Sequence, residues 1–218
     1  LALRDKFGNP LGSEEALQTA EKLEVQHAWP LQAWKEIGED KYERIYQAQN
    51  TGANLQARLT VSDGDISSEP YLITAGDVNA GQSALSANPT SIEANNKEMP
   101  STLTYKAMDA WKNPVTGLTD NNSLTLKVTG LGGTEFSGFT DKGEGIYTGT
   151  LTGTQSGQAS LMPQVNNVDM APDVTSVTLT AGKAVAKNSR INVGAANFTA
   201  GTRFTVTVTL RDASENPV

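Results

Sequence analysis

Cysteine is absent from the chain, and histidine occurs once among its 218 residues. Disulfides and thiolate metal sites are therefore excluded, and one histidine leaves too few ligands for a histidine-based zinc site. Basic residues are also scarce, because 17 Lys and Arg stand against 24 Asp and Glu, for a net charge of −7. Nucleic-acid-binding domains usually carry a basic face, and anionic membrane surfaces repel acidic proteins. Neither partner is expected.

Long apolar runs and catalytic motifs are missing as well. No segment approaches the roughly 20 apolar residues of a spanning helix, so no membrane insertion is expected. No glycine-rich loop follows a strand and opens a helix, as phosphate-binding loops do. A Ser-His-Asp triad would have to use His27, which is expected to be an ordinary position of a predicted strand at residues 23–28. The sequence therefore predicts that the chain is not an enzyme.

The sequence does contain a repeat of about one hundred residues. Its landmark is an aspartate followed, after three residues, by Asn-Pro. Three copies occur, at Asp5, Asn9 and Pro10, at Asp109, Asn113 and Pro114, and at Asp212, Asn216 and Pro217. Other landmarks keep nearly the same step, namely Tyr42 and Tyr147, Thr51-Gly52 and Ser156-Gly157, and Gly76 and Gly182. Such a period is that of a whole domain and exceeds the ~20–50 residues of solenoid repeats.

Strand patterns dominate within the copies. Residues 204–210 alternate apolar side chains with Thr, which is typical of a half-buried strand. The same alternation places Leu103, Tyr105 and Ala107 on one predicted face. Asn-Pro, Gly-Gly and Asp-Gly breakers separate the strands at short intervals, as in an all-β sandwich.

One segment, residues 13–23, has helix propensity, and Ser13 is a plausible N-cap. The interval from the proline of the landmark to the following tyrosine is nevertheless 32 positions in the first copy and 33 in the second. This near-equality leaves no room for an inserted helix, so we expect one helical turn at most, followed by the strand near residues 23–28.

The repeat predicts three segments. Residues 1–75 form an Ig-like domain that lacks its opening strands, residues 76–175 form a complete domain, and residues 176–218 supply only the opening strands of a third. Incomplete sandwiches expose unpaired edges, which favour association. We therefore expect the last segment to complete a first copy, either of a neighbouring chain, as strand-complemented self-association, or of its own chain.

Taken in order, these landmarks resemble the bacterial immunoglobulin-like domains of the invasin and intimin family of outer-membrane adhesins (inverse autotransporters). The resemblance rests on Asp-x-x-x-Asn-Pro-Val, on Gly-x-Gly-x-Tyr ending at Tyr147, and on a junction-like segment at residues 75–81. It implies tandem immunoglobulin-like β-sandwiches in an extracellular rod, anchored to the outer membrane by a part outside this chain. The first copy departs from the pattern at Asp40-Lys41, where the second has Gly145-Ile146, so its hairpin turn should be less ideal.

The repeated residues also have a mechanical interpretation. Asn-Pro favours a turn because proline fixes φ and cannot donate a hydrogen bond. The aspartate four residues before the Asn-Pro asparagine can accept backbone N–H bonds across that turn. Tyr42 and Tyr147 are candidates for a buried ring with a hydrogen-bonded hydroxyl, like a tyrosine corner. We interpret these positions as fold-specifying residues.

Two further groups of residues suggest recognition or metal binding. Trp29 and Trp34 are speculative ligand-binding residues, because exposed tryptophan is a favoured contact at interfaces; alternatively one fills the core and the other covers a loop. Trp111 is expected to be partly exposed. Calcium at the domain junctions is an alternative for an acidic set that lacks the Asp-x-Asp-x-Asp-Gly loop, but solvated acidic loops explain the set and no cofactor is expected. That set is Asp63, Asp65, Glu69, Asp77, Asp169 and Asp173.

The leading functional hypothesis is a rod or stalk segment that spaces a distal host-binding tip of an adhesin from the outer membrane. Its partners would be neighbouring Ig-like repeats and, through the parent adhesin, a host cell-surface protein or glycan. A second hypothesis is an Ig-like module that itself binds a host protein or glycan. A third is an accessory domain of a secreted polysaccharide-active or phage tail protein.

Overall fold

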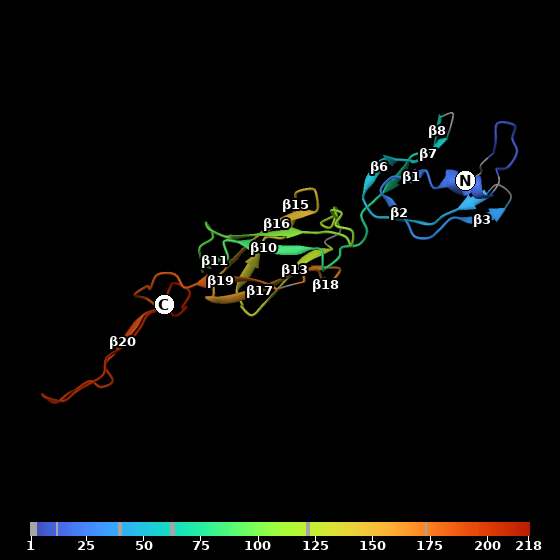
Figure 1. Cartoon of the computed structure of the whole chain (residues 1–218). Coiled ribbons are helices and arrows are strands. Elements are labelled where there is room, and N and C mark those ends of the chain that lie inside the picture. The colour runs from blue at the N-terminus through green and yellow to red at the C-terminus, as the bar shows by residue number, and fades with distance from the viewer. Residues whose placement is uncertain (1–3, 12, 39–40, 62–63, 121–122, 173) are drawn as a thin grey trace. The chain divides into compact units, whose positions relative to one another are not determined.

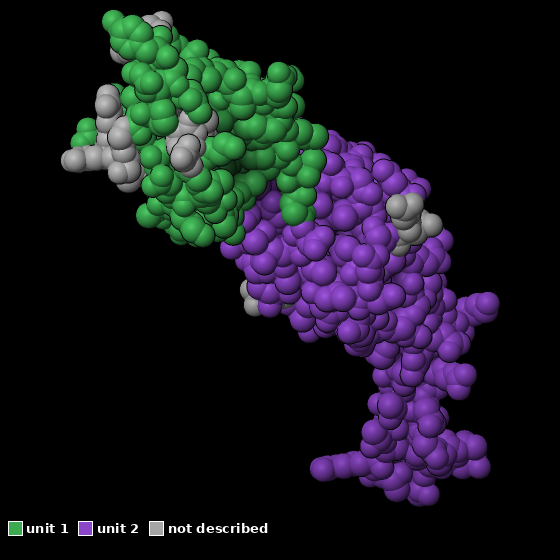
Figure 2. All heavy atoms as spheres, turned by 90° about the vertical axis from the view of Figure 1, so that its right-hand side faces the viewer, with its two compact units in different colours: residues 1–76 green, residues 77–218 purple. Residues whose placement is uncertain are grey.

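The computed structural model describes residues 4–11, 13–38, 41–61, 64–120, 123–172 and 174–218. The chain divides into two compact units, residues 1–76 (unit 1) and residues 77–218 (unit 2), as Figures 1 and 2 show. Strands make up nearly all of the regular structure, which confirms the all-β prediction. Within the described ranges, no helix has the length and apolar character needed to cross a membrane.

Unit 2 contains a sandwich of two sheets. The first sheet consists of β10 (Ala84–Asn88), β12 (Ser101–Lys106), β14 (Thr134–Phe136), β15 (Thr140–Asp141) and β16 (Ile146–Gly153). The second sheet consists of β11 (Ser91–Glu93), β13 (Leu124–Thr129), β17 (Gly157–Val165), β18 (Val168–Asp169) and β19 (Thr175–Thr180). The strand orders are β10-β12-β16-β14 and β11-β19-β17-β13, with β15 beside β16 and β18 beside β17. All pairs are antiparallel except β11 with β19.

The core of this sandwich lies between the inner faces of the two sheets. Leu103, Tyr105 and Ala107 are fully buried, as the alternation predicts. Tyr105 of β12 stands opposite Tyr147 of β16, and the two rings pack with centroids 6.5 Å apart. β19 pairs with β17 over residues 175–179, so the pairing of this module continues past the expected boundary near residue 175.

Unit 1 carries a smaller version of the same architecture. Its elements are α1 (Ser13–Ala20), β1 (Leu23–Val25), β2 (Ala28–Pro30), β3 (Lys35–Gly38), β4 (Lys41–Glu43), β5 (Tyr46–Ala48), β6 (Gly52–Leu55), β7 (Ala57–Val61), β8 (Gly64–Ser67) and β9 (Tyr71–Ile73). They form the sheet β1-β7-β8 and the pairs β2-β5, β3-β4 and β6-β9. The pairing of β4 with β3 and of β5 with β2 matches that of β16 with β15 and β14. Among the described residues, no strand pairs with the other edge of β4 and β5, where β12 pairs with β16 in unit 2.

The helix α1 corrects one expectation from the sequence. It spans eight residues, so the expectation of one helical turn at most is wrong. Ala16 and Ala20, one turn apart, are buried against Tyr42 and Leu59, which gives the helix a packing partner. The equal intervals between proline and tyrosine in the two copies did not reveal the helix, because α1 occupies the place of the loop that precedes β13 in unit 2. The helix therefore needs no additional residues.

The expectation for His27 was also wrong, because this residue lies in a turn between β1 and β2 and not in a strand. Its φ is +59°, in the left-handed region that few non-glycine residues adopt. The imidazole Nδ1 lies 3.0 Å from the carbonyl oxygen of Thr51. A side chain at Gly52 would come within 2.9 Å of that ring, which explains why glycine stands at this position. The contacts of His27 with Thr51 and Gly52 therefore indicate a structural role for this residue in the turn.

The last part of unit 2, residues 183–218, forms the hairpin of β20 (Arg190–Asn192) and β21 (Thr207–Thr209). The predicted strand at residues 204–210 is shorter than expected, and all seven of its residues are exposed. In the described part of the chain, β20 and β21 pair only with each other. Completion of unit 1 by the tail of the same chain is therefore wrong for this structure, while completion of a neighbouring chain stays a prediction.

Candidate functional site

The repeat landmark folds into a closed turn, seen in unit 2 at Asp109. The carboxylate Oδ1 of Asp109 accepts hydrogen bonds from the backbone N–H groups of Trp111 and Asn113, both at 2.8 Å. Oδ2 accepts a third bond, at 2.8 Å, from the side-chain amide of Asn113. The two ends are joined by a bridge between Met108 and Pro114. One carboxylate thus satisfies the polar groups that the turn would leave unpaired.

The other two copies have the same geometry. Asp5 Oδ1 accepts from the backbone N–H groups of Phe7 and Asn9 at 2.8 and 2.9 Å. Asp212 accepts from Ser214 and Asn216, both at 2.9 Å. In each copy the residue before the asparagine has a positive φ, at Gly8, Lys112 and Glu215. Three different sequences adopt one backbone shape because the Asp and Asn side chains determine it.

The tyrosine of the repeat supports this turn in unit 2. Tyr147 is fully buried, and its hydroxyl donates to the carbonyl oxygen of Val115 at 2.9 Å. The same hydroxyl accepts from the N–H of Leu118 at 3.3 Å. Gly145, two residues earlier, has φ +68° and approaches the carbonyl of Ala107 so closely that a Cβ would lie 2.5 Å away. Its counterpart in unit 1, Asp40, lies outside the described residues.

The third copy of the turn packs against the end of the sandwich in unit 2. The Asn216 side chain accepts from the N–H of Ser156 at 2.8 Å and donates to the carbonyl of Thr154 at 2.9 Å. Asp212 Oδ2 accepts from the N–H of Gly182 at 3.0 Å. Asp212 and Asn216 are 1% and 6% exposed, so the contact buries both polar side chains with their partners satisfied.

These contacts form the joint between the sandwich and the following segment, and the sequence did not predict them. The joint is bordered by a shallow cavity of about 260 Å³ whose walls include Glu93, Asn95, Lys183 and Ala213. Thr154 and Ser156 contribute only backbone groups, which leave no side-chain signature. The sequence feature that could have indicated the joint is that Ser156-Gly157 and Gly182 recur with nearly the same period as the turn.

Two aspartates of the turn have shifted pKa values. Hydrogen bonds from the side chain and backbone of Asn9 lower the pKa of Asp5. At Asp212, burial acts to raise the pKa, but the bonds from Asn216, Gly182 and Ser214 together outweigh it, and the net pKa is lowered. Both carboxylates are therefore held in the charged form that accepts these bonds.

The two tryptophans of unit 1 lie in different environments. Trp29, on β2, is 61% exposed, and Leu31 and Ile45 beside it are 60% and 55% exposed. Trp34 is half-buried and packs against the cluster of Ala16, Ala20, Tyr42 and Leu59. Its Nε1 is buried and has no hydrogen-bond partner among the described residues, and the Arg44 guanidinium lies 5.8 Å from its ring centroid. Of the pair, Trp29 is the one placed for contact with a ligand. Trp111 is 43% exposed.

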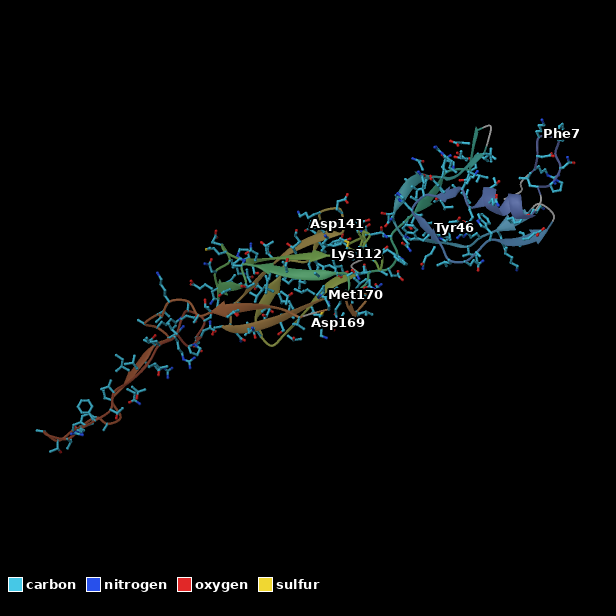
Figure 3. All side chains as sticks on the ribbon, in the orientation of Figure 1. Phe7, Tyr46, Lys112, Asp141, Asp169 and Met170 are labelled. Atoms are coloured by element: carbon cyan, nitrogen blue, oxygen red, sulfur yellow. The ribbon has the colours of Figure 1, made fainter. Side chains whose placement is uncertain are left out.

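The acidic residues considered for calcium do not converge in the described part of the chain. No group of three or more His, Cys, Asp or Glu side chains suited to a metal occurs there, while Asp63 and Asp173 lie outside it. Asp65 accepts a bond from Thr60 at 2.8 Å, and Asp169 accepts one from Gln164 at 2.7 Å. In unit 2, Figure 3 shows Asp169 beside its chain neighbour Met170.

Comparisons with known proteins show which proteins the chain is similar to. Residues 79–182 match the family model described as invasin, domain 3. A stretch of 118 residues, 54% of the chain, is 37% identical to the inverse autotransporter adhesin YeeJ of Escherichia coli strain K12. This match covers 5% of YeeJ, so the chain spans a small part of that relative.

Solved structures share the fold. The Escherichia coli adhesin FdeC matches with a TM-score of 0.59 and 24% identity, over 99% of this chain and 68% of that one. Invasin, described as a bacterial integrin-binding protein, matches with a TM-score of 0.60 and 22% identity, over 100% of this chain and 43% of that one. The predicted tandem immunoglobulin-like fold is thereby confirmed. With residues 79–182 matching invasin domain 3, the predicted resemblance to the invasin and intimin family of adhesins is confirmed too.

Proposed function

We propose that this chain is a rod segment of a bacterial surface adhesin, which spaces a distal host-binding region from the outer membrane. It acts outside the cell, anchored through a part of the adhesin beyond these residues. Its direct partners are neighbouring Ig-like repeats, and the host protein or glycan is contacted elsewhere in the adhesin. The likeness to YeeJ, an adhesin by name, favours this proposal over an accessory domain of a polysaccharide-active or phage tail protein.

The observation that carries the proposal is the joint at Asp212 and Asn216. The residues that define the repeat close a turn and, in the third copy, also hold that turn to the preceding sandwich. A motif that is used once per domain and joins consecutive domains is what a stacked array requires. The partners on the sandwich are mostly backbone groups, so the joint tolerates variation in side chains between repeats.

The test exchanges these residues within the full adhesin displayed on bacteria. One variant replaces the segment with an equal number of Ig-like repeats from an unrelated array, and the other deletes it. A spacer predicts that replacement keeps adhesion to host cells and that deletion weakens it. If replacement reduces adhesion as much as deletion does, the surface of this segment takes part in binding.

A second candidate function, direct binding of a host protein or glycan, is favoured by the exposed face around Trp29. This face presents an apolar surface of the kind found at the centre of interfaces, made of Trp29, Leu31 and Ile45. Trp29→Ala on the full adhesin should leave adhesion unchanged if the segment is a spacer and reduce it if the segment binds. Trp111→Ala, at another exposed tryptophan, is the matched control.

A further inference from the structure

The turns of the first and third copies are alike in detail but differ in burial. Asn9 donates to Asp5 Oδ2 at 3.0 Å, as Asn216 donates to Asp212 Oδ2 at 2.8 Å. In both copies an arginine precedes the aspartate, and Arg4 and Arg211 each donate to the carbonyl of the residue before the asparagine. Asn216 is buried, whereas Asn9 is exposed.

What covers the third turn is known from the structure. The side-chain amide of Asn216 contacts a C=O and an N–H two residues apart on the β16–β17 hairpin, at Thr154 and Ser156. The free lone pairs of Asp212 Oδ2 receive the N–H of Gly182, just after β19. The complementary surface is therefore the end of an Ig-like sandwich, described by three backbone groups.

The first turn presents the same groups with no such cover. The Asn9 Oδ1 and the second hydrogen of its amide have no partner among the described residues. Phe7, at the tip of the turn, is 77% exposed, and Figure 3 shows it projecting from the rest of unit 1. Because the turn is closed by its own hydrogen bonds, it needs no rearrangement to be covered, which lowers the cost of docking.

We propose that the Asp5–Pro10 turn is a docking surface for the end of another Ig-like module of the kind in unit 2. The hairpin of that module would give its equivalents of the Thr154 carbonyl and the Ser156 N–H to Asn9. Its equivalent of the Gly182 N–H would bind Asp5. The proposal rests on the rod function proposed above, and it names the partner and the atoms of one joint.

The first experiment measures hydrogen exchange at the third turn, which is already covered in this chain. Asn216→Ala should raise the hydrogen-exchange rates of the Ser156 and Gly182 amides by about tenfold, because the joint that protects them is lost. Asn9→Ala removes the same bond within its own turn and should leave both amides unchanged. If Asn216→Ala has no effect on the exchange rates of these two amides, the joint at Asp212 and Asn216 is not formed in solution and the proposal fails.

The decisive experiment gives the first turn a partner. The chain is extended by its own residues 77–211, placed directly before Asp5 in place of residues 1–4, and only the added module carries 15N. The Ser156 and Gly182 amides of the added module should be protected as in the original unit 2. Asn9→Ala should then raise their exchange about tenfold, while Asn216→Ala should not.

Two results would overturn the docking surface. The added amides could exchange freely in the extended chain, or their protection could be insensitive to Asn9→Ala. Either result leaves the adhesion test of the rod function untouched, since that test depends on length and not on this turn. Conversely, a joint that forms in a chain whose replacement abolishes adhesion would keep the docking surface and remove the spacer role.

Discussion

The two units contain equivalent strand pairs, but the side chains on the outer faces of these pairs differ in polarity. In unit 2, β14 pairs with β16 so that Glu135 faces Thr152, and in unit 1 the same pairing of β2 with β5 places Trp29 opposite Gln47. Polar side chains surround Glu135, which forms a 3.0 Å ion pair with Lys97. In unit 1 the residue opposite Trp29 is polar, but two exposed apolar side chains, Leu31 and Ile45, lie nearby. The framework therefore restricts the inward positions and leaves the outer face free to differ.

The inner faces differ for another reason. Leu151 of β16 is fully buried, whereas Tyr46, at the equivalent position of β5, is only half-buried. In unit 2 the edge of β16 is paired with β12 over residues 146–151, which include Leu151. At this position, burial follows the presence of the opening strand, whereas the repeat tyrosine is buried in both units, at Tyr42 and Tyr147.

The largest expected effect tests this difference in cores. Leu103→Ala, on β12, should destabilise unit 2 by about 2–5 kcal/mol, because it leaves a cavity at a fully buried position. Ile45→Ala in unit 1 is the control and should change the free energy of unfolding by less than about 0.5 kcal/mol, since Ile45 is 55% exposed. Urea unfolding, followed separately for each unit, measures both. Equal losses would mean that the exposed face of unit 1 is covered in solution.

A smaller effect is expected at the tyrosine that supports the turn. Tyr147→Phe removes a hydroxyl that bonds to Val115 and Leu118, and it should cost about 0.5–1.5 kcal/mol. Tyr46→Phe is the control in unit 1, because Tyr46 stands at the position of Leu151 and its hydroxyl has no hydrogen bond among the described residues. Thermal unfolding should separate the two variants. A Tyr147→Phe variant as stable as the parent would show that the turn needs no support.

The next prediction concerns acid. The pKa of Asp212 is lowered in the folded chain, so its contribution to the joint is present above the ordinary pKa of 3.8 and is lost as the pH falls through the lowered value. Asp212→Asn should therefore reduce the protection of the Gly182 amide at neutral pH and have little further effect once the pH has fallen below the lowered pKa, where the parent is protonated. The same change at Asp5 should not alter Gly182. A variant with the full pH response of the parent would contradict this assignment.

The smallest effect is expected on the outer face of unit 1. Trp29→Glu on β2, combined with Leu31→Ser just after it, gives this face the polar character of β14 and should change stability by less than about 0.5 kcal/mol per site. Binding of a hydrophobic dye should fall at the same time, because exposed apolar area is removed. Glu135→Trp in unit 2 is the reciprocal change and should raise dye binding. A large loss of stability in the first variant would place Trp29 in the packing of unit 1.

Much of the fold could be predicted because it depends on local patterns. The period-2 alternation around Tyr105 placed the inward face of β12, and the spacing of Asp, Asn and Pro indicated the turn. The helix α1 was underestimated because the residue count between landmarks cannot distinguish a helix from a loop of equal length. His27 was misplaced because a positive φ leaves no mark in the sequence when the residue is not glycine.

By itself, the sequence determined the repeat, the sandwich strands and the chemistry of the turn, since each depends on which side chains stand at fixed spacing. Only the tertiary structure decided which turn is covered and by what. Asn216 is held by the backbone of Thr154 and Ser156, and backbone groups are the same in every residue. Their position, brought about by the β16–β17 hairpin, is what makes them a partner.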